Sequence, residues 1–255
     1  MKKILLLPLL FITIYAQGNF SGVTYFDYTY DLTNGAANDA GFSLKRVYFT
    51  YEEKLSENLS YKFQTDINYK TSPLNIYLKN AKIDWELPGG SFGKLTLGLQ
   101  GMNIFNVTEK TWGFRFIEKS PMDSHGFSSS ADMGIGISGK LRGLSYSVLS
   151  TNGAGYKKQE SDAFKKTSVQ LVYGNKKINK KDGFNIGASF SHEPYRLADA
   201  SQNDSQTVMA FFTGYAGNGL RVGGEFDMHT DSHGNKTQQI IAFYASYKTM
   251  DNLEG

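Results

Sequence analysis

The chain has 255 residues, and with Lys2 and Lys3 set aside 25 basic residues remain against 24 acidic ones. This balance excludes a global field that attracts nucleic acid or anionic membranes, so we expect no nucleic-acid partner. The sequence contains no cysteine, which excludes a disulfide scaffold and a thiolate metal site in an exported protein. We expect no cofactor.

Residues 1–16 have the three parts of a secretory signal peptide. Lys2 and Lys3 form a basic start, residues 4–14 are apolar, and Ala16 is a suitable last residue before cleavage. The apolar run is too short for a spanning helix. We therefore expect residues 17–255 to form one exported domain after cleavage.

The stretch 59–70 alternates between apolar or aromatic residues and polar residues. One face carries Leu59, Tyr61, Phe63, Thr65, Ile67 and Tyr69, and the other carries Ser60, Lys62, Gln64, Asp66, Asn68 and Lys70. This period of two predicts a strand with one apolar and one wet face. Its length is close to the roughly 9–11 residues that a tilted strand needs to cross a bilayer.

Similar segments follow one another along the chain with no helical period between them. We predict strands at about 20–31, 42–55, 59–70, 76–87, 93–100, 131–140, 143–152, 164–174, 183–192, 206–217, 219–229 and 237–248. In the strand 76–87, the apolar face is expected to carry Tyr77, Ala81, Ile83, Trp85 and Leu87. The strands 42–55 and 206–217 have apolar residues at both parities, so the pattern leaves their facing open.

The connections alternate between longer polar linkers and tight turns. The segments 56–58, 88–90 and 217–219 have good turn chemistry, whereas 71–75 and 175–182 break the alternation by their lengths. Long loops at one end and short turns at the other are typical of outer-membrane barrels. A soluble β-sandwich has no reason to alternate in this way, so we predict an all-β, transmembrane antiparallel β-barrel in contact with outer-membrane lipid.

The longest connection, 101–130, mixes aromatic and charged residues. Its charged residues are Glu109, Lys110, Arg115, Glu118, Lys119 and Asp123. A structureless loop of this length in a compact domain is unusual and tends to be functional. We expect it to fold into the barrel as a constriction, and the alternative is a loop packed over the barrel mouth.

Two parts of the sequence resemble the phosphate-selective porin O and P family. The segment 42–66 (FSLKRVYFTYEEKLSENLSYKFQTD) resembles the opening hairpin of these porins, and 130–134 with 139–141 and 152–153 resembles their middle. The resemblance implies a trimeric, sixteen-stranded diffusion channel whose third loop narrows the pore. Twelve strands are visible, and the chain stops at Gly255 in what looks like another strand, so we expect a missing C-terminal part. A complete twelve-stranded barrel is the alternative.

The residues expected to line the pore carry both signs of charge, whereas phosphate-selective members line it with basic residues. The expected lining residues are Arg46, Lys62, Asp66, Lys70, Lys82, Asp84, Glu86, Lys94, Arg221, Glu225 and Asp227. We predict passive diffusion of small hydrophilic solutes or anions through a water-filled homotrimeric porin, with no covalent step.

Two other functions are weaker. Asp227, His229, Asp231 and His233 have the i, i+2 spacing of one strand face, but they lie near a loop tip, where such residues are ordinarily solvated. His192 beside Ser189 or Ser191 is the best candidate for a barrel hydrolase, yet nothing in the sequence orients it. A structural barrel with a plugged interior is the remaining alternative.

Overall fold

The computed structural model describes residues 18–33, 40–69, 71–89, 93–160, 162–196 and 203–248. The expected signal peptide, Lys70 and the segment after residue 248 lie outside the described residues. The first six strands are β1 (Asn19–Tyr30), β2 (Ala40–Lys54), β3 (Leu59–Asn68), β4 (Asn75–Glu86), β5 (Lys94–Gly101) and β6 (Ala131–Leu141). The other six are β7 (Leu144–Thr151), β8 (Lys166–Gly174), β9 (Gly183–Tyr195), β10 (Asp204–Gly217), β11 (Leu220–Asp231) and β12 (Lys236–Tyr247). Two short helices, α1 (Thr108–Trp112) and α2 (Pro121–Ser124), lie between β5 and β6.

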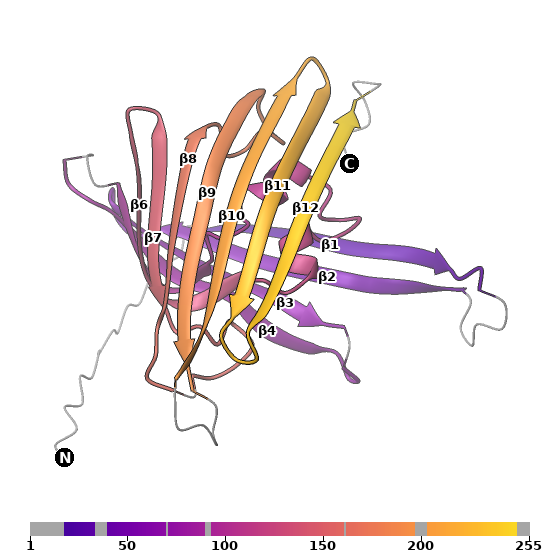
Figure 1. The fold of residues 1–255 in the computed structure, drawn as a ribbon. Helices are drawn as coiled ribbons and strands as arrows, with labels where there is room; N and C mark the ends of the chain where they lie inside the picture. Colours follow the sequence, from indigo (N-terminus) through magenta and orange to yellow (C-terminus); the bar gives the residue numbers. More distant parts are fainter. Residues whose placement is uncertain are drawn as a thin grey trace.

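The twelve strands form one antiparallel sheet in which each strand pairs with its neighbours in the chain. The all-β prediction is confirmed, and no strand end differs from its predicted position by more than three residues. The sheet curls strongly: β6–β12 form an upright wall, β1–β4 run across behind it, and the helices lie between them (Figure 1). Within the described residues, β1 and β12 are the two edges of the sheet and do not pair with each other.

Tight turns close the hairpins at one end of the sheet. Asn218 and Gly219 have φ of 52° and 80°, and Arg142 and Gly143 have φ of 48° and 88°. Two successive positive φ angles define the type I′ turn, whose twist matches that of paired antiparallel strands. The 101–130 segment and most of the longer connections lie at the other end, and the β8–β9 connection, residues 175–182, is an exception at the tight-turn end.

Two β-bulges change which residues face inward. In the β3–β4 ladder Gln64 pairs with Asn80 and Thr65 with Leu78, so Lys79 is an extra residue on β4. In the β1–β2 ladder Arg46 and Leu44 pair with successive residues of β1, so Lys45 is the extra residue there. A bulge of this kind shifts the side-chain parity beyond it.

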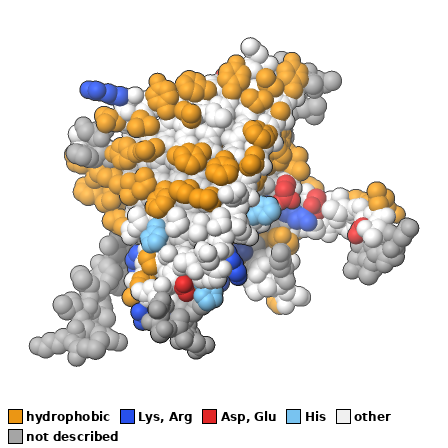
Figure 2. Space-filling view, viewed as in Figure 1, with side chains coloured by type: hydrophobic (Ala, Val, Ile, Leu, Met, Phe, Trp, Pro, Cys, Tyr) orange, Lys and Arg blue, Asp and Glu red, His pale blue; other side chains and the backbone are white. Residues whose placement is uncertain are grey.

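The outer face of the sheet is covered with large apolar side chains. Figure 2 shows them in rows across the outer face of the wall, with charged side chains gathered away from the rows. Exposed members include Leu97, Ile135, Leu171, Ile186, Phe211 and Ile241. An apolar surface of this extent is far larger than a water-soluble monomer presents, and it fits a hydrocarbon environment. Among the described residues, none of the helices has the length and apolar character needed to span a membrane.

The segment 101–130 builds the hydrophobic core on the inner face. Ile104, Phe105, Met122 and Phe127 pack with Val208 and Ala210 of β10, and Val107 packs with Phe212 and Val172. These contacts explain the apolar residues at both parities of the strand predicted at 206–217. One face of β10 meets the surroundings of the protein, and the other is covered by the 101–130 segment.

Candidate functional site

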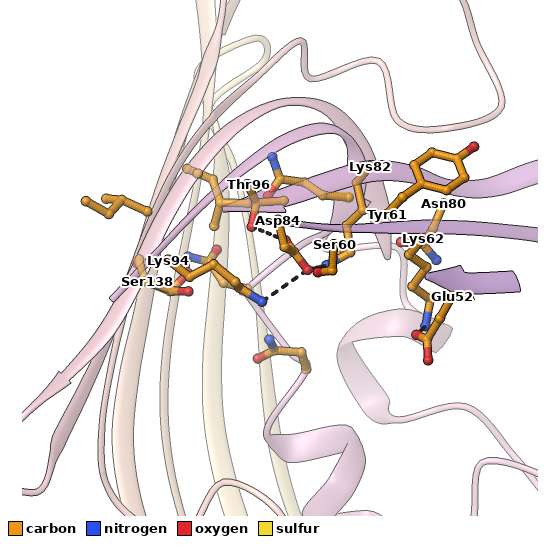
Figure 3. A pocket seen from close by; sticks show the side chains of 18 of the residues that line it. Glu52, Ser60, Tyr61, Lys62, Asn80, Lys82, Asp84, Lys94, Thr96 and Ser138 are labelled. Carbon is orange, nitrogen blue, oxygen red and sulfur yellow. Dashed lines mark hydrogen bonds and ion pairs between the residues drawn. The ribbon is translucent and has the colours of Figure 1, made fainter. Parts of the chain in front are cut away.

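A polar cavity of about 630 Å³ lies on the inner face, mainly along β2–β6. At its centre, Asp84 Oδ2 accepts from Lys82 Nζ at 2.8 Å and Lys94 Nζ at 3.2 Å. Thr96 Oγ1 donates to Asp84 Oδ1 at 2.6 Å. Figure 3 shows Asp84, Lys94 and Thr96 converging from neighbouring strands. One carboxylate is therefore shared by two ammonium groups, which leaves a local surplus of positive charge.

A second row of polar side chains crosses β2, β3 and β4 on the same face. Lys62 Nζ lies 2.7 Å from Glu52 Oε1. Asn80 donates to Gln64 at 2.8 Å, and Gln64 donates to Thr50 at 2.8 Å. These cross-strand pairs fix the side chains laterally, so the wall of the cavity is ordered although it is hydrophilic.

Asp66 is fully buried nearer the long-loop end of β3. Arg46 Nη1 donates to Asp66 Oδ2 at 2.5 Å, and the Tyr77 hydroxyl donates to the same oxygen at 2.7 Å. The prediction that Tyr77 belongs to the apolar outer face is therefore wrong. The bulge at Lys79 separates Tyr77 from the rest of β4 and turns its ring inward.

Lys79 is a functional candidate that the sequence reasoning missed. Its ammonium donates to Ser130 Oγ and lies 3.8 Å from the ring centre of Tyr156. Burial raises the pKa of Tyr156, but the ammonium groups of Lys79 and Lys157 outweigh it, so the pKa is lowered. Strict alternation puts Lys79 on the lipid side, where a lysine is costly. That conflict was the signal in the sequence that β4 contains a bulge.

The segment 101–130 covers the inner face of the opposite wall. Asn103 Nδ2 donates to the Ser147 carbonyl at 3.0 Å, and Gln170 Nε2 donates to the Asn103 carbonyl and, at 3.0 Å, to Asn106 Oδ1. α1 packs on β10 and β11, and α2 packs on β12. The described segment therefore lies against the inner wall along much of its length.

Most charges of this segment pair with one another. Arg115 Nε lies 3.0 Å from Glu109 Oε2, and Arg115 Nη2 lies 2.9 Å from Asp123 Oδ2. Lys119 lies 3.7 Å from Asp123 and is half exposed. Glu118 accepts the Lys119 amide at 2.7 Å through its side chain. The pair with Arg115 does not outweigh the burial of Glu109, whose pKa is raised.

Lys110 differs from these residues because its surroundings are basic. Burial lowers its pKa, and the nearby Lys177 and Lys176 lower it further, with Glu109 acting in the opposite direction. Burial and the neighbouring lysines Lys94, Lys177 and Lys140 lower the pKa of Lys176 in the same way. The lysines of the β8–β9 turn were not among the predicted site residues, although this turn is unusually long for its end of the sheet.

The three predicted residues of β11 divide into two environments. Arg221 Nη2 donates to the Trp112 carbonyl at 3.3 Å and lies against the Phe114 ring. Glu225 and Asp227 are 4% and 0% exposed. They lie opposite Phe212 and Ala210, which the 101–130 segment covers. Arg221 thus holds the segment, and the two carboxyl groups lie beneath it.

The remaining predicted residues have simpler positions. Glu86 is exposed at the turn end of β4, opposite Lys94 in the ladder. Lys70 lies outside the described residues. The structure thus brings Lys82, Asp84 and Lys94 together and keeps Arg46 with Asp66 as a separate pair. A pore-lining role for the whole set stays a prediction.

The histidine clusters do not assemble into a reactive site. Ser189 and Ser191 are buried on one side of β9, and His192 is exposed and contacts Thr207 at 3.3 Å. Asp231 accepts from Tyr195, and His233 lies 3.2 Å from Asp204. Among the residues that the structure describes, no three histidine or acidic side chains converge as metal ligands.

A family model, phosphate-selective porin O and P, matches residues 19–248. The chain belongs to this family. It is therefore an outer-membrane porin, a β-barrel channel protein, as the resemblance in the sequence predicted. No curated protein matches the sequence of this porin.

Among solved structures, an OmpF porin has a similar fold, and two other outer-membrane proteins match with lower scores. OmpF of Salmonella typhi, in a complex with daunomycin, is 12% identical, with a TM-score of 0.60 over 92% of this chain and 75% of that chain. A mutant of the Rh. blastica porin is 12% identical, with a TM-score of 0.45 over 91% of each chain. OmpT of Vibrio cholerae, with a loop deletion, is 10% identical, with a TM-score of 0.44 over 91% of this chain and 89% of that chain.

Proposed function

We propose that this porin is a passive diffusion channel for small hydrophilic solutes, with a weak preference for anions. The observation that carries the proposal is the polar cavity of about 630 Å³ on the inner face, lined by ordered charged and amide side chains. Water can fill such a space, and an ion passing through it meets fixed charges at close range. No covalent step is required, and the porin is not proposed to be an enzyme.

The segment 101–130 is proposed to narrow this channel. Its apolar residues pack against β10. Its paired charges lie on the side away from that wall, where the charge of Lys79 lowers the pKa of Glu109. A segment fixed on one wall and charged toward the other reduces the cross-section without closing it. This arrangement supports inward folding over packing at the barrel mouth.

The anion preference is proposed from which charges remain uncompensated. The carboxylates of Asp84, Glu109 and Asp123 each lie within ion-pair distance of one or two cations. Lys110 and Lys176 have mainly basic neighbours. Glu225 and Asp227 are buried beneath the 101–130 segment, so they are shielded from the solute path. The uncompensated charges that a solute can reach are therefore mainly positive and favour anions, although the formal charge of the chain is nearly neutral.

We also propose that the complete barrel has sixteen strands and forms a homotrimer. Among the described residues, β1 and β12 each have a neighbour on one side only, and open sheet edges are not stable in lipid. Further strands between β1 and β12 would pair with both edges and close the barrel. Chemical cross-linking of the natural full-length protein in mild detergent tests the trimer.

The decisive experiment is single-channel recording in a planar bilayer under a salt gradient. We expect discrete open steps and a reversal potential with the sign of anion preference. The variant Lys110→Met/Arg115→Met/Lys119→Met, which removes three cations of the segment, is expected to shift the reversal potential toward cations. A correctly folded barrel without open steps contradicts the channel proposal. An unchanged reversal potential in the variant places the segment outside the solute path.

A further inference from the structure

The turn between β8 and β9, residues 175–182, folds back onto the inner face of the sheet. Ile178 is only 3% exposed, although it belongs to a turn. Asn175 fixes the backbone, because its Oδ1 accepts the Lys177 amide at 3.0 Å and its Nδ2 donates to the Lys181 carbonyl at 2.8 Å. The turn is therefore an ordered element with an apolar anchor, which accounts for its unusual length.

Ile178 and α1 meet over Gly214 of β10. A Cβ atom on Gly214 would lie 2.5 Å from Thr111 Cγ2 and 2.7 Å from Ile178 Cδ1. Gly223 pairs with Gly214 across the ladder, and a Cβ atom there would lie 2.7 Å from Thr111 Cγ2. Both distances to Thr111 are shorter than real Cβ contacts. Glycine is therefore required where α1 and the turn pack together on β10 and β11.

Asn185 joins the same two segments by hydrogen bonds. Its Nδ2 donates to Thr111 Oγ1 at 3.3 Å and to the Asn175 carbonyl at 3.0 Å. Asn185 is completely buried, so these partners are not exchanged for water. One amide group thus connects a helix from the long-loop end with a turn from the opposite end of the barrel.

Electrostatics opposes this contact. Lys110 adjoins Thr111. The charges of Lys177, Lys176 and Lys180 lower the pKa of Lys110. Like charges repel, and salt screens the repulsion. The packing at Gly214 and the amide of Asn185 therefore hold α1 and the turn together against their charges.

We propose that Asn185 and Gly214 are positioning residues that couple the β8–β9 turn to α1, so that the turn sets the place of α1 and Lys110. This inference deepens the proposed function, and its channel readout rests on the proposal that the 101–130 segment narrows the pore. The turn then acts as a second element of the constriction, supplied from the tight-turn end.

A cross-linking experiment tests the contact without any channel measurement. The protein contains no cysteine, so Thr111→Cys/Ile178→Cys provides a unique thiol pair for a short bifunctional reagent. We expect efficient cross-linking, and faster cross-linking at high salt than at low salt. The control pair Thr111→Cys/Ser56→Cys uses the β2–β3 turn, at the same end of the sheet, and is expected to remain unlinked. Equal yields from the two pairs overturn the inference.

A clash-and-rescue series tests the positioning role. Gly214→Ala is expected to push α1 off the wall, lower the single-channel conductance and shift the reversal potential. The triple variant Gly214→Ala/Thr111→Ser/Ile178→Val removes the two methyl groups that meet the new Cβ, and it is expected to restore both values. Heat-modifiable gel mobility identifies the folded barrel in each case.

Asn185→Ala provides a second route that adds no volume, for use where Gly214→Ala does not fold. It is expected to shift the reversal potential, because its side chain no longer joins Thr111 to the Asn175 carbonyl. Wild-type values in folded Gly214→Ala or Asn185→Ala overturn the positioning role. A silent wild-type channel with efficient cross-linking instead contradicts the proposed function and leaves the contact established.

Discussion

The inner faces of β2–β5 and β8–β11 differ in what covers them. Along β2–β5, side chains such as Lys62, Asn80 and Asp84 line a cavity, and each is hydrogen-bonded to a side chain of an adjacent strand. Along β8–β11, Val172, Ala210 and Phe212 lie under the 101–130 segment. The two halves use the same strand geometry. The character of the inward side chains depends on what they contact, which is water in one half and the 101–130 segment in the other.

The first prediction contrasts one residue from each half and carries the largest expected effect. Phe212→Ala removes a buried ring that packs with Val107 and Val172, and should lower the free energy of unfolding by about 3–5 kcal/mol. Asn80→Ala removes one amide hydrogen bond beside the cavity and should cost only about 1 kcal/mol. Urea unfolding of the protein refolded into vesicles measures both. Equal costs contradict the comparison.

The second prediction concerns the charges that the covered half presents. Arg115→Met leaves Glu109 and Asp123 without their shared cation, and should lower the free energy of unfolding by about 1–2 kcal/mol in this partly exposed site. The matched variant Glu109→Gln/Arg115→Met/Asp123→Asn removes the repulsion as well and should recover most of the loss. The same unfolding assay compares them, and an unimproved triple variant argues against a charge effect.

The third prediction uses the pH dependence of Lys110. Burial and the neighbouring lysines lower its pKa below the ordinary 10.5, so Lys110 loses its charge before a free lysine as the pH rises. Because the folded pKa lies below the unfolded one, the charge of Lys110 opposes folding, and this penalty declines as the pH rises from the folded pKa to the unfolded pKa. As Lys110 loses its charge, the proposed anion preference should decline at a pH below 10.5. Lys110→Met should abolish that part of the decline in reversal-potential measurements.

The fourth prediction is the smallest effect. Lys119 is half exposed and lies 3.7 Å from Asp123, so Lys119→Met should change the free energy of unfolding by less than about 0.5 kcal/mol. Its reversal potential should also stay close to the wild-type value, unlike that of Lys110→Met. A shift as large as that of Lys110→Met would show that ion pairing does not decide which lysines select the solute.

Each strand that the structure describes was predicted from the sequence, because alternation and turn chemistry are local properties. The prediction failed at Tyr77 and Lys79, because a bulge inserts one residue without a turn signal and reverses the parity. It also left the facing of the strand at 206–217 open, since Val208 and Ala210 are apolar only on account of a distant segment. The positioning role proposed for Asn185 could not be predicted from the sequence. Its role depends on α1 and the β8–β9 turn arriving at one place from opposite ends of the barrel.

The anchoring of the 101–130 segment also imposes an order on biogenesis. Its contacts with Arg221 and Tyr244 span 109 and 136 positions of the chain. The segment is therefore exported before the strands on which it packs. Until β10 has formed, Ile104, Phe105 and Met122 lack their packing partners on that strand. Contacts between such distant positions form late, and unpaired apolar side chains promote aggregation. We therefore expect the segment to reach its final place on the inner wall only after β10 and β11 have formed.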